Sequence, residues 1–493
     1  MEFYIMAVQV KRKPLKLYPD PKRVVARFFM PGRPDRARSI VYRVEKLSGK
    51  EAKKTFEQVL KDFSSRHREL YRVLEENFER VKQEIGEEEV NWDSLSHVKK
   101  LLISSYFTME YSIESAAFFN PSIVVDPVQT GLPDGSTSVI VSFRATGEGH
   151  ISSIVFRKGV IDRSNALFLD TASNFVEMPE VVKRHLYNRS AFLKKLEEMH
   201  IYKDVIGMVM DPLGEEFTYG ELQASISETM KQKELSYTRK QVIHAINWLA
   251  DSHYEVTFSQ DTALSERVLF PVSWAESNGI EDARFVRFLQ DDGKVQYYAT
   301  YTAYNGYTIL PKLLQTEDFY HFKIMPLHGK GMQNKGVSLF PRKVGGRYAM
   351  VSRCDGVNNY IMFSDNINVW NNAKVIEEPL FPWEFVQIGN CGSPIETKEG
   401  WILITHGVGP VRKYCLGAAL LDLEDPSRMI ARLEDPLISP NENERDGYVP
   451  NIVYSCGSIA INGELLIPYG MADYGTSFAA VGIEELLTEM KRV

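Results

Sequence analysis

Five stretches of this chain repeat one pattern, and the repeat restricts the folds that the chain can adopt. Each stretch has a turn with glycine, a short apolar strand and a polar cluster at the strand's end. The stretches are residues 133–147, 274–306, 344–356, 398–409 and 462–475. From Tyr301 to Ser352, Thr405 and Tyr469 the successive steps are 51, 53 and 64 residues. A period of about 50 residues built from short strands is typical of a β-propeller blade.

The clearest of these stretches is residues 274–306. Residues 285–288 alternate in polarity, the turn Asp291-Asp292-Gly293-Lys294 follows, and residues 295–302 form a second alternating run. Alternating runs separated by Asp-Gly predict a β-hairpin. The carboxylate pair Glu281-Asp282 stands just before the first run, where we expect a loop to present both groups and the sheet to hold them.

The polar strand ends decide between two architectures. Equivalent strand ends carry Arg144, Arg353 with Asp355, His406 and Asp473. An ordinary β-sandwich with glycine turns is the alternative, but it would scatter these side chains, whereas blades arranged radially bring them to one central cavity. The sequence therefore predicts a mainly β protein, a five-bladed β-propeller with an N-terminal helical extension and a helical insertion between blades 1 and 2.

The composition and net charge of the chain exclude several classes of protein. The chain has 493 residues, 44% hydrophobic and 25% charged, with a net charge of −7, so bulk attraction to nucleic acid or an anionic membrane is not expected. No apolar run reaches bilayer length, and the start has the wrong charge order for a signal peptide. The four cysteines form no CxxC pair, and no nucleotide fingerprint occurs, so we expect no metal and no organic cofactor. Buried, reduced cysteines indicate a cytoplasmic protein.

Helical periodicity marks two further parts of the chain. Residues 51–87 carry an apolar stripe, and a second helix is predicted over residues 92–119, ended by Asn120-Pro121. Residues 23–30 and 38–44 alternate and predict strands of an arm. The predicted domains are 1–116 (strand arm and helices), 117–171 (blade 1), 172–265 (helical insertion) and 266–493 (blades 2–5). The helices serve as scaffold or as contacts of a homo-oligomer, or else bind a different partner.

The expected cavity has two kinds of side chain. One rim holds acids with aromatic hydroxyls: Glu281, Asp282, Asp473, Tyr301 and Tyr304. The other holds cations: Lys335, Arg353 and His406. Carboxylates and hydroxyls suit a sugar, and clustered cations suit a phosphate. Together they favour phosphorolysis of a glycoside with inversion, in which an acid assists the leaving oxygen while phosphate attacks from the opposite face.

Several motifs in order resemble those of one enzyme family. They are SNGIEDARFV, the strand end YTAYNG, GSPIETKEGWILITHG, LGAALLDLEDPSR and IPYGMADYGTSFA. Together they resemble glycoside hydrolase family 130, which comprises five-bladed propeller enzymes acting on β-mannosides. The resemblance covers residues 120–171 and 274–489, and leaves both helical segments outside.

The resemblance implies roles for particular residues. Asp282, in the Glu-Asp-x-Arg motif, is implied to be the general acid, acting through the mannosyl 3-hydroxyl. Arg144 and Asp473 are implied to hold the mannosyl unit of a mannose-containing oligosaccharide. Arg353 and His406, and more loosely Lys335, match positions that bind the co-substrate phosphate. The remaining substrate-binding candidates are Asn120, Glu281 and Tyr304.

The chain also departs from the family pattern. Where many phosphorylases have Pro-Pro-Ile-Lys-Thr, residues 393–397 read Ser-Pro-Ile-Glu-Thr, and the carboxylate of Glu396 would weaken phosphate binding or act as a base for water. A β-mannosidase of the same fold is therefore the close alternative. A non-catalytic sugar-binding propeller, and a purely structural ion-pair network of the cations with the acids, are two others. Phosphorolysis is preferred because Arg353 and His406 offer an anion site, and neither Glu396 nor Glu384 is assigned as a base for water.

Overall fold

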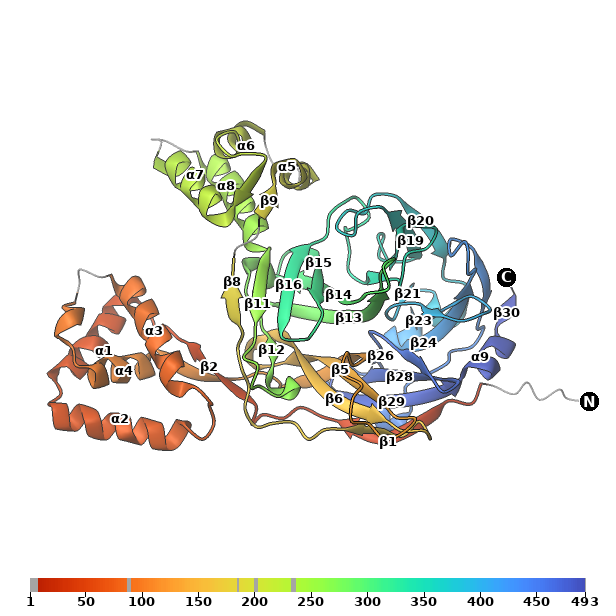
Figure 1. Cartoon of the computed structure of the whole chain (residues 1–493), viewed down its shortest axis with the longest axis horizontal. Helices are drawn as coiled ribbons and strands as arrows, with labels where there is room; N and C mark the ends of the chain where they lie inside the picture. Colours follow the sequence, from red (N-terminus) through yellow and green to blue (C-terminus); the bar gives the residue numbers. More distant parts are fainter. Residues whose placement is uncertain (1–7, 87–89, 184–185, 199–202, 232–235, 493) are drawn as a thin grey trace, which may run out of the picture.

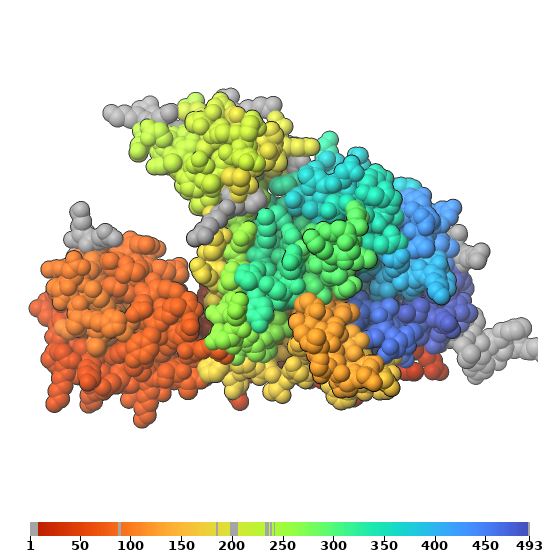
Figure 2. All heavy atoms as spheres, viewed as in Figure 1, coloured from red at the N-terminus to blue at the C-terminus, as the bar shows by residue number. Residues whose placement is uncertain are grey.

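The computed structural model describes residues 8–86, 90–183, 186–198, 203–231 and 236–492. It is mainly β with two groups of helices, as predicted. Figure 1 shows three parts: a body of sheets, an N-terminal helical lobe at one side and a second helical group above the body. In the space-filling view the two helical groups protrude from the body as separate projections (Figure 2). None of the described helices is long and apolar enough to span a membrane.

In the part of the chain that the structure describes, five sheets of four or more strands form the body. The first contains β12 (Val268–Leu269), β6 (Ser152–Ile161), β5 (Thr137–Thr146), β4 (Ala117–Val125) and β7 (Leu167–Leu169). The second contains β13 (Gly279–Leu289), β14 (Val295–Tyr304), β15 (Ile309–Thr316), β16 (His321–Pro326), β11 (Tyr254–Thr257) and β8 (Glu180–Val182). The third contains β17 (Ser338–Leu339), β18 (Tyr348–Ser352), β19 (Asn359–Ser364) and β20 (Ala373–Glu377).

The last two sheets come from the C-terminal part of the chain and take in strands from elsewhere. The fourth contains β21 (Gln387–Asn390), β22 (Ile395–Glu396), β23 (Trp401–Val408), β24 (Tyr414–Leu421), β25 (Met429–Arg432) and β30 (Lys491–Arg492). The fifth contains β26 (Val453–Tyr454), β27 (Ile459–Ile461), β28 (Glu464–Met471), β29 (Gly475–Gly482) and the N-terminal β1 (Lys11–Leu17). All pairings within these sheets are antiparallel.

Each sheet packs against the next, and the fifth packs against the first. The pairs in contact are β4 with β13, β14 with β17, β18 with β21, β24 with β26, and β28 with β4. Hydrogen bonds cross two of these boundaries. The Phe285 amide donates to Ser122 Oγ at 3.1 Å, and the Cys456 amide donates to the Pro121 carbonyl at 2.9 Å. Glycine permits the closest approach, since a Cβ on Gly457 would stand 2.3 Å from Ser122 Oγ. These contacts join the five sheets into a continuous series, from the first to the fifth and back to the first.

Within the described residues, the N-terminal lobe contains four α-helices around its own apolar core. They are α1 (Pro34–Lys46), α2 (Gly49–Phe63), α3 (Leu70–Ile85) and α4 (His97–Tyr106). The lobe is tied to the body by β2 (Val24–Phe28) pairing with β3 (Thr108–Ser112) and by Arg68, whose Nη2 lies 2.7 Å from Glu266 Oε2.

Two predictions for this lobe were wrong in detail. Residues 38–44 belong to helix α1, because proline at its start and the buried Ala37, Val41 and Val44 follow a helical spacing rather than an alternation. The single helix predicted over residues 51–87 is two helices, α2 and α3. The polar stretch between them turns back, and His67 Nε2 contacts Glu110 Oε1 at 2.8 Å.

The helix predicted over residues 92–119 was also wrong. Helix α4 begins after Ser96, whose hydroxyl accepts from the Lys99 amide, and it ends at Tyr106. The residues that follow form β3 and the start of β4 because they find partner strands. Asn120 and Pro121 therefore lie inside β4, at an irregularity of its pairing, and they do not end a helix.

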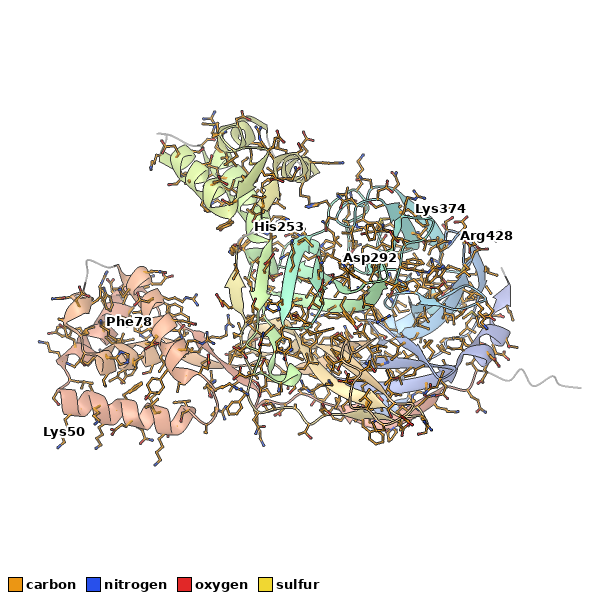
Figure 3. The ribbon with its side chains drawn as sticks, in the orientation of Figure 1. Lys50, Phe78, His253, Asp292, Lys374 and Arg428 are labelled. Carbon is orange, nitrogen blue, oxygen red and sulfur yellow. The ribbon has the colours of Figure 1, made fainter. Side chains whose placement is uncertain are left out.

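The second helical group is inserted in the range 172–265. It contains α5 (Arg189–Glu198), α6 (Lys203–Met210), α7 (Tyr219–Lys231), α8 (Tyr237–Asp251) and the short strands β9 (Leu186–Asn188) and β10 (Glu216–Thr218). Its own apolar core includes Leu222 and Ile246, while Trp248 packs on the core of the second sheet. His253 lies where the group joins the body (Figure 3). Within the same range, β8 and β11 are strands of the second sheet, and the domain boundaries stay a prediction.

Candidate active site

Asp282 lies in a β-bulge of strand β13. The pairing of β13 with β14 shifts between Glu281 and Arg284, and Asp282 has a φ of 54°, a left-handed backbone that few non-glycine residues adopt. The bulge turns consecutive side chains out of the normal alternation. The carboxylate pair was expected in a loop before the strand, and this was wrong: the pair is part of β13, where the ladder holds it more rigidly than a loop would.

Asn120 occupies a matching bulge in the neighbouring strand β4. The pairing of β4 with β5 shifts between Phe119 and Ser122, and Asn120 has a φ of 47°. Its Nδ2 donates to Asp282 Oδ1 at 2.7 Å. Two strained backbone positions therefore face each other across the first and second sheets, as is common where a site needs fixed geometry.

Arg144 and Lys335 complete the acid cluster. Arg144 Nη2 donates to Glu281 Oε1 at 2.8 Å, and its Nη1 lies 3.3 Å from Asp282 Oδ1. Lys335 Nζ is 3.6 Å from Glu281 Oε2. Burial would raise the pKa of Asp282, but the charges of Arg144 and Arg284 and the Asn120 hydrogen bond bring it below the usual value. Asp282 is therefore ionised in the free protein.

Arg284 and Tyr454 connect this cluster to the cations on the opposite side. Arg284, two residues beyond Asp282, is buried and donates from Nη2 to the Tyr454 hydroxyl at 2.6 Å. The Tyr454 ring lies edge-on to the His406 ring, with 4.9 Å between the ring centres. Burial raises the pKa of the Tyr454 phenol well above its usual value, so the hydroxyl stays protonated and can donate to a further acceptor.

His406 and Arg353 form the cationic end of the site. Arg353 Nη1 lies 3.4 Å from His406 Nε2, and a guanidinium can only donate, so Nε2 is the acceptor. Burial and the charges of Arg353 and Arg284 hold the pKa of His406 well below its usual value. His406 is thus a neutral imidazole protonated at Nδ1, which lies 3.7 Å from Cys391 Sγ. In this state the positive charge comes from the two arginines, and His406 orients Arg353.

Three guanidinium nitrogens of the site are buried without a hydrogen-bond partner among the residues that the structure describes, namely the Nε atoms of Arg144, Arg284 and Arg353. Arg144 belongs to the acid cluster, whereas Arg284 and Arg353 lie on the cationic side. A buried donor without a partner is costly, and an anion between the two side chains would satisfy both.

Asp473 is the last residue of the cluster, and its charge state differs from that of Asp282. It is half-buried at the loop after β28, with a φ of 48°. Burial first, and then the charge of Asp282, raise its pKa to about 6, against the opposing charges of Arg144, Arg412 and Lys335. The titrations of the two carboxyl groups are therefore coupled, and the proton that remains longest as pH rises is on Asp473.

The structure thus brings together most of the predicted site residues. One set of contacts joins Asn120, Arg144, Glu281, Asp282 and Lys335. A second contact joins Arg353 and His406, and the pKa of Asp473 responds to the charges of the first set. Tyr304 is peripheral, because its hydroxyl donates to the Gly306 carbonyl at 2.9 Å.

Three residues considered from the sequence lie in structural networks instead. The Tyr301 hydroxyl is buried and donates to Glu276 Oε1 at 2.6 Å, so it is not on the acid rim as expected. Glu396 forms a two-point ion pair with Arg342 on the surface, at 2.8 and 2.7 Å. Glu384, also weighed as a base, is buried against Arg432 and accepts from two backbone amides.

Arg284, Tyr454 and Cys391 were not among the predicted site residues. Arg284 belongs to the Glu-Asp-x-Arg motif, and this motif could have identified it as a site residue. Tyr454 and Cys391 could not be identified in this way, because each is a single residue of a short inner segment. Packing of the fifth sheet on the fourth brings Tyr454 to His406, and pairing of β21 with β23 brings Cys391 there.

The raised pKa of Asp473 predicts a pH-dependent effect on stability. A carboxyl group that titrates higher in the folded than in the unfolded chain stabilises the fold fully below about pH 4, and this contribution is lost as pH rises through about 6. Asparagine cannot ionise. The Tm of Asp473→Asn relative to wild type is therefore expected to increase from about pH 5 to about pH 8 in thermal unfolding scans. A Tm difference that does not change with pH would contradict the assignment.

Comparison with known proteins gives a consistent picture. The profile of a family described as beta-1,4-mannooligosaccharide phosphorylase matches residues 229–492. A 1,2-beta-oligomannan phosphorylase of Thermoanaerobacter sp. (strain X514) is 35% identical over 223 residues, which cover 43% of this chain and 71% of that protein. A beta-1,2-mannobiose phosphorylase of the same strain is 34% identical over 224 residues, covering 43% of this chain and 69% of that protein.

Among solved structures, the beta-1,2-mannobiose phosphorylase from Listeria innocua in complex with beta-1,2-mannobiose has a TM-score of 0.45 at 22% identity, covering 76% of this chain and 92% of that one. The family match extends over more than half of the chain and contains the bulge with Asp282 as well as Arg353, His406 and Asp473. The chain belongs to glycoside hydrolase family 130.

Proposed function

We propose that this protein is an inverting β-mannoside phosphorylase that releases mannose 1-phosphate from a mannose-containing oligosaccharide. The observation that carries the proposal is a pair of guanidinium groups, Arg284 and Arg353, whose buried Nε atoms lack a partner among the described residues. Arg284 is two residues from Asp282 and lowers the pKa of that carboxyl group, and Arg353 contacts His406. The phosphorylases among its relatives support the same assignment.

The acid cluster suits the mannosyl unit. Arg144 and Asn120 hold Glu281 and Asp282 in place, and ionised carboxylates accept hydrogen bonds from sugar hydroxyls. Asp282 is ionised in the free protein, whereas Asp473 retains a proton up to about pH 6. A proton for the leaving oxygen must therefore reach Asp282 or a mannosyl hydroxyl beside it once substrate has displaced water. Asp473, whose pKa is raised by burial and by the charge of Asp282, is a group of suitable pKa for this transfer.

The cationic side suits phosphate as the nucleophile. Arg353 and Arg284 supply charge and unpaired N–H donors, neutral His406 fixes Arg353, and Tyr454 has a hydroxyl proton to donate. Phosphate bound here would approach the anomeric carbon from the side opposite the leaving oxygen, which gives inversion.

We also propose that the five sheets are the blades of a five-bladed β-propeller whose axis passes through the site. The support is the sequence of contacts from each sheet to the next and from the fifth back to the first. Pairing of the N-terminal β1 with β29 in the last sheet would close such a ring.

The proposed function is tested by phosphate dependence. Wild-type protein is incubated with β-1,2-, β-1,3- and β-1,4-mannobiose, with and without inorganic phosphate. Release of mannose 1-phosphate only when phosphate is present is the expected result. Mannose released at equal rates with and without phosphate would indicate a hydrolase, and binding without turnover of any substrate would indicate a sugar-binding protein.

A further inference from the structure

Strained backbone is concentrated in three neighbouring loops beside Asp473. They are the loop between β5 and β6, the loop between β23 and β24, and the loop between β28 and β29. They contain His150 (φ 61°), Val411 (57°), Arg412 (54°), Ala472 (48°) and Asp473 (48°). Non-glycine residues keep such angles only where the surroundings impose them, and these positions are common in ligand-binding loops.

A pair of aromatic rings links the first sheet to the fifth, because His150 of the β5–β6 loop contacts Tyr448 of the segment before β26. The His150 and Tyr448 rings are 5.3 Å apart at 32°, and the Tyr448 hydroxyl lies 3.3 Å from His150 Nδ1. Tyr448 is 56% exposed, although it is fixed by the adjacent Val449 amide, which donates to the Ala472 carbonyl at 2.9 Å. The pair is therefore a rigid, solvent-facing surface next to the loop that holds Asp473.

Arg412 lies on the same rim. It is exposed, and its charge is among those that lower the pKa of Asp473 against the larger effects of burial and Asp282. The loop that carries Arg412 is held beside the segment of Tyr448, because the Tyr414 amide donates to the Asn451 carbonyl at 3.0 Å.

We propose that His150, Tyr448 and Arg412 form the subsite for the leaving-group sugar, the unit that departs when the mannosidic bond is broken. The inference rests on the proposed function. The deep residues Asn120, Arg144 and Asp282 already contact one another and suit the mannosyl unit. An exposed ring pair suits the sugar that must enter and leave, because the C–H face of a pyranose packs on an aromatic surface while a guanidinium donates to its hydroxyls.

The test separates the leaving-group subsite from the mannosyl and phosphate sites. In the synthetic direction, mannose 1-phosphate and an acceptor sugar are varied separately for wild type, Tyr448→Ala and His150→Ala, with whichever of mannose, glucose or N-acetylglucosamine the wild type uses. The KM for the acceptor is expected to rise about ten-fold in both variants, and the KM for mannose 1-phosphate to change less than about two-fold. Tyr448→Phe keeps the ring and should remain near wild type.

A matched control and a second measurement make the result decisive. Tyr42→Ala removes a tyrosine that is 57% exposed on helix α1 and should leave both KM values unchanged. Calorimetric titration of mannobiose into phosphate-free protein should show about ten-fold weaker binding to Tyr448→Ala. An unchanged acceptor KM, or equal increases for acceptor and mannose 1-phosphate, would overturn the subsite. Absence of phosphate-dependent turnover by the wild type would overturn the proposed function instead, and the titration would still decide whether Tyr448 contacts the sugar.

Discussion

Replacing Asp282 by asparagine is expected to lower the rate of phosphorolysis about a thousand-fold, the middle of the range for loss of a general acid or base. Asparagine matches aspartate in shape, and its carbonyl oxygen can still accept from Asn120 Nδ2 and Arg144 Nη1. The bulge and the cluster should therefore persist. The loss should fall on kcat, while the KM for the mannoside changes little, as for an interaction made in the transition state.

The control for this variant comes from the same hairpin. Asp292 lies in the exposed turn between β13 and β14, at the far end of the strand that carries Asp282 (Figure 3). Asp292→Asn should retain wild-type release of mannose 1-phosphate. If Asp282→Asn kept more than about a tenth of the wild-type rate, the proton would have to pass through another group, and Asp473 would be the first to replace.

Local signals in the sequence predicted the strands that pair with their immediate neighbours. The hairpin of β13 and β14 followed from its Asp-Gly turn and alternating runs, and the structure confirms it. The predictions of a strand for residues 38–44 and of a helix for residues 107–119 were wrong, because a short apolar run fits both the helical and the strand period. Partner strands decided the second case: β3 and the start of β4 pair with β2 and β5, a long-range choice that no window of sequence contains.

The site was predictable as a set of residues but not as a geometry. Asp282 and Asn120 adopt a left-handed backbone in bulges that face each other, and the residue type alone does not predict such a φ angle. The contact between Arg284 and Tyr454 joins positions 170 residues apart. The neutral state of His406 depends on burial and on Arg353, so a histidine expected to act as a cation acts as a hydrogen-bond acceptor.

Replacing Arg353 by methionine is expected to raise the KM for phosphate by about 100- to 1,000-fold. Methionine keeps most of the apolar stem and removes the charge and the unpaired Nε donor. Loss of one partner from a buried charged contact costs about 2–5 kcal/mol, and each 1.4 kcal/mol is about ten-fold in affinity. The KM for the mannoside, extrapolated to saturating phosphate, should stay near wild type, because the acid cluster is held by Arg144 and Asn120.

Arg347→Met is the matched control for the anion site. Arg347 precedes the same strand, β18, but is exposed, and it packs over the Phe363 ring at 4.9 Å. Its loss should leave the KM for phosphate unchanged. Because His406 orients Arg353 without carrying charge, His406→Gln should raise the KM for phosphate less than Arg353→Met does, by about ten-fold. A KM for phosphate that was unaffected by Arg353→Met would place the anion elsewhere. Equal effects of both arginine variants would mean that long-range charge, and not direct contact, attracts the phosphate.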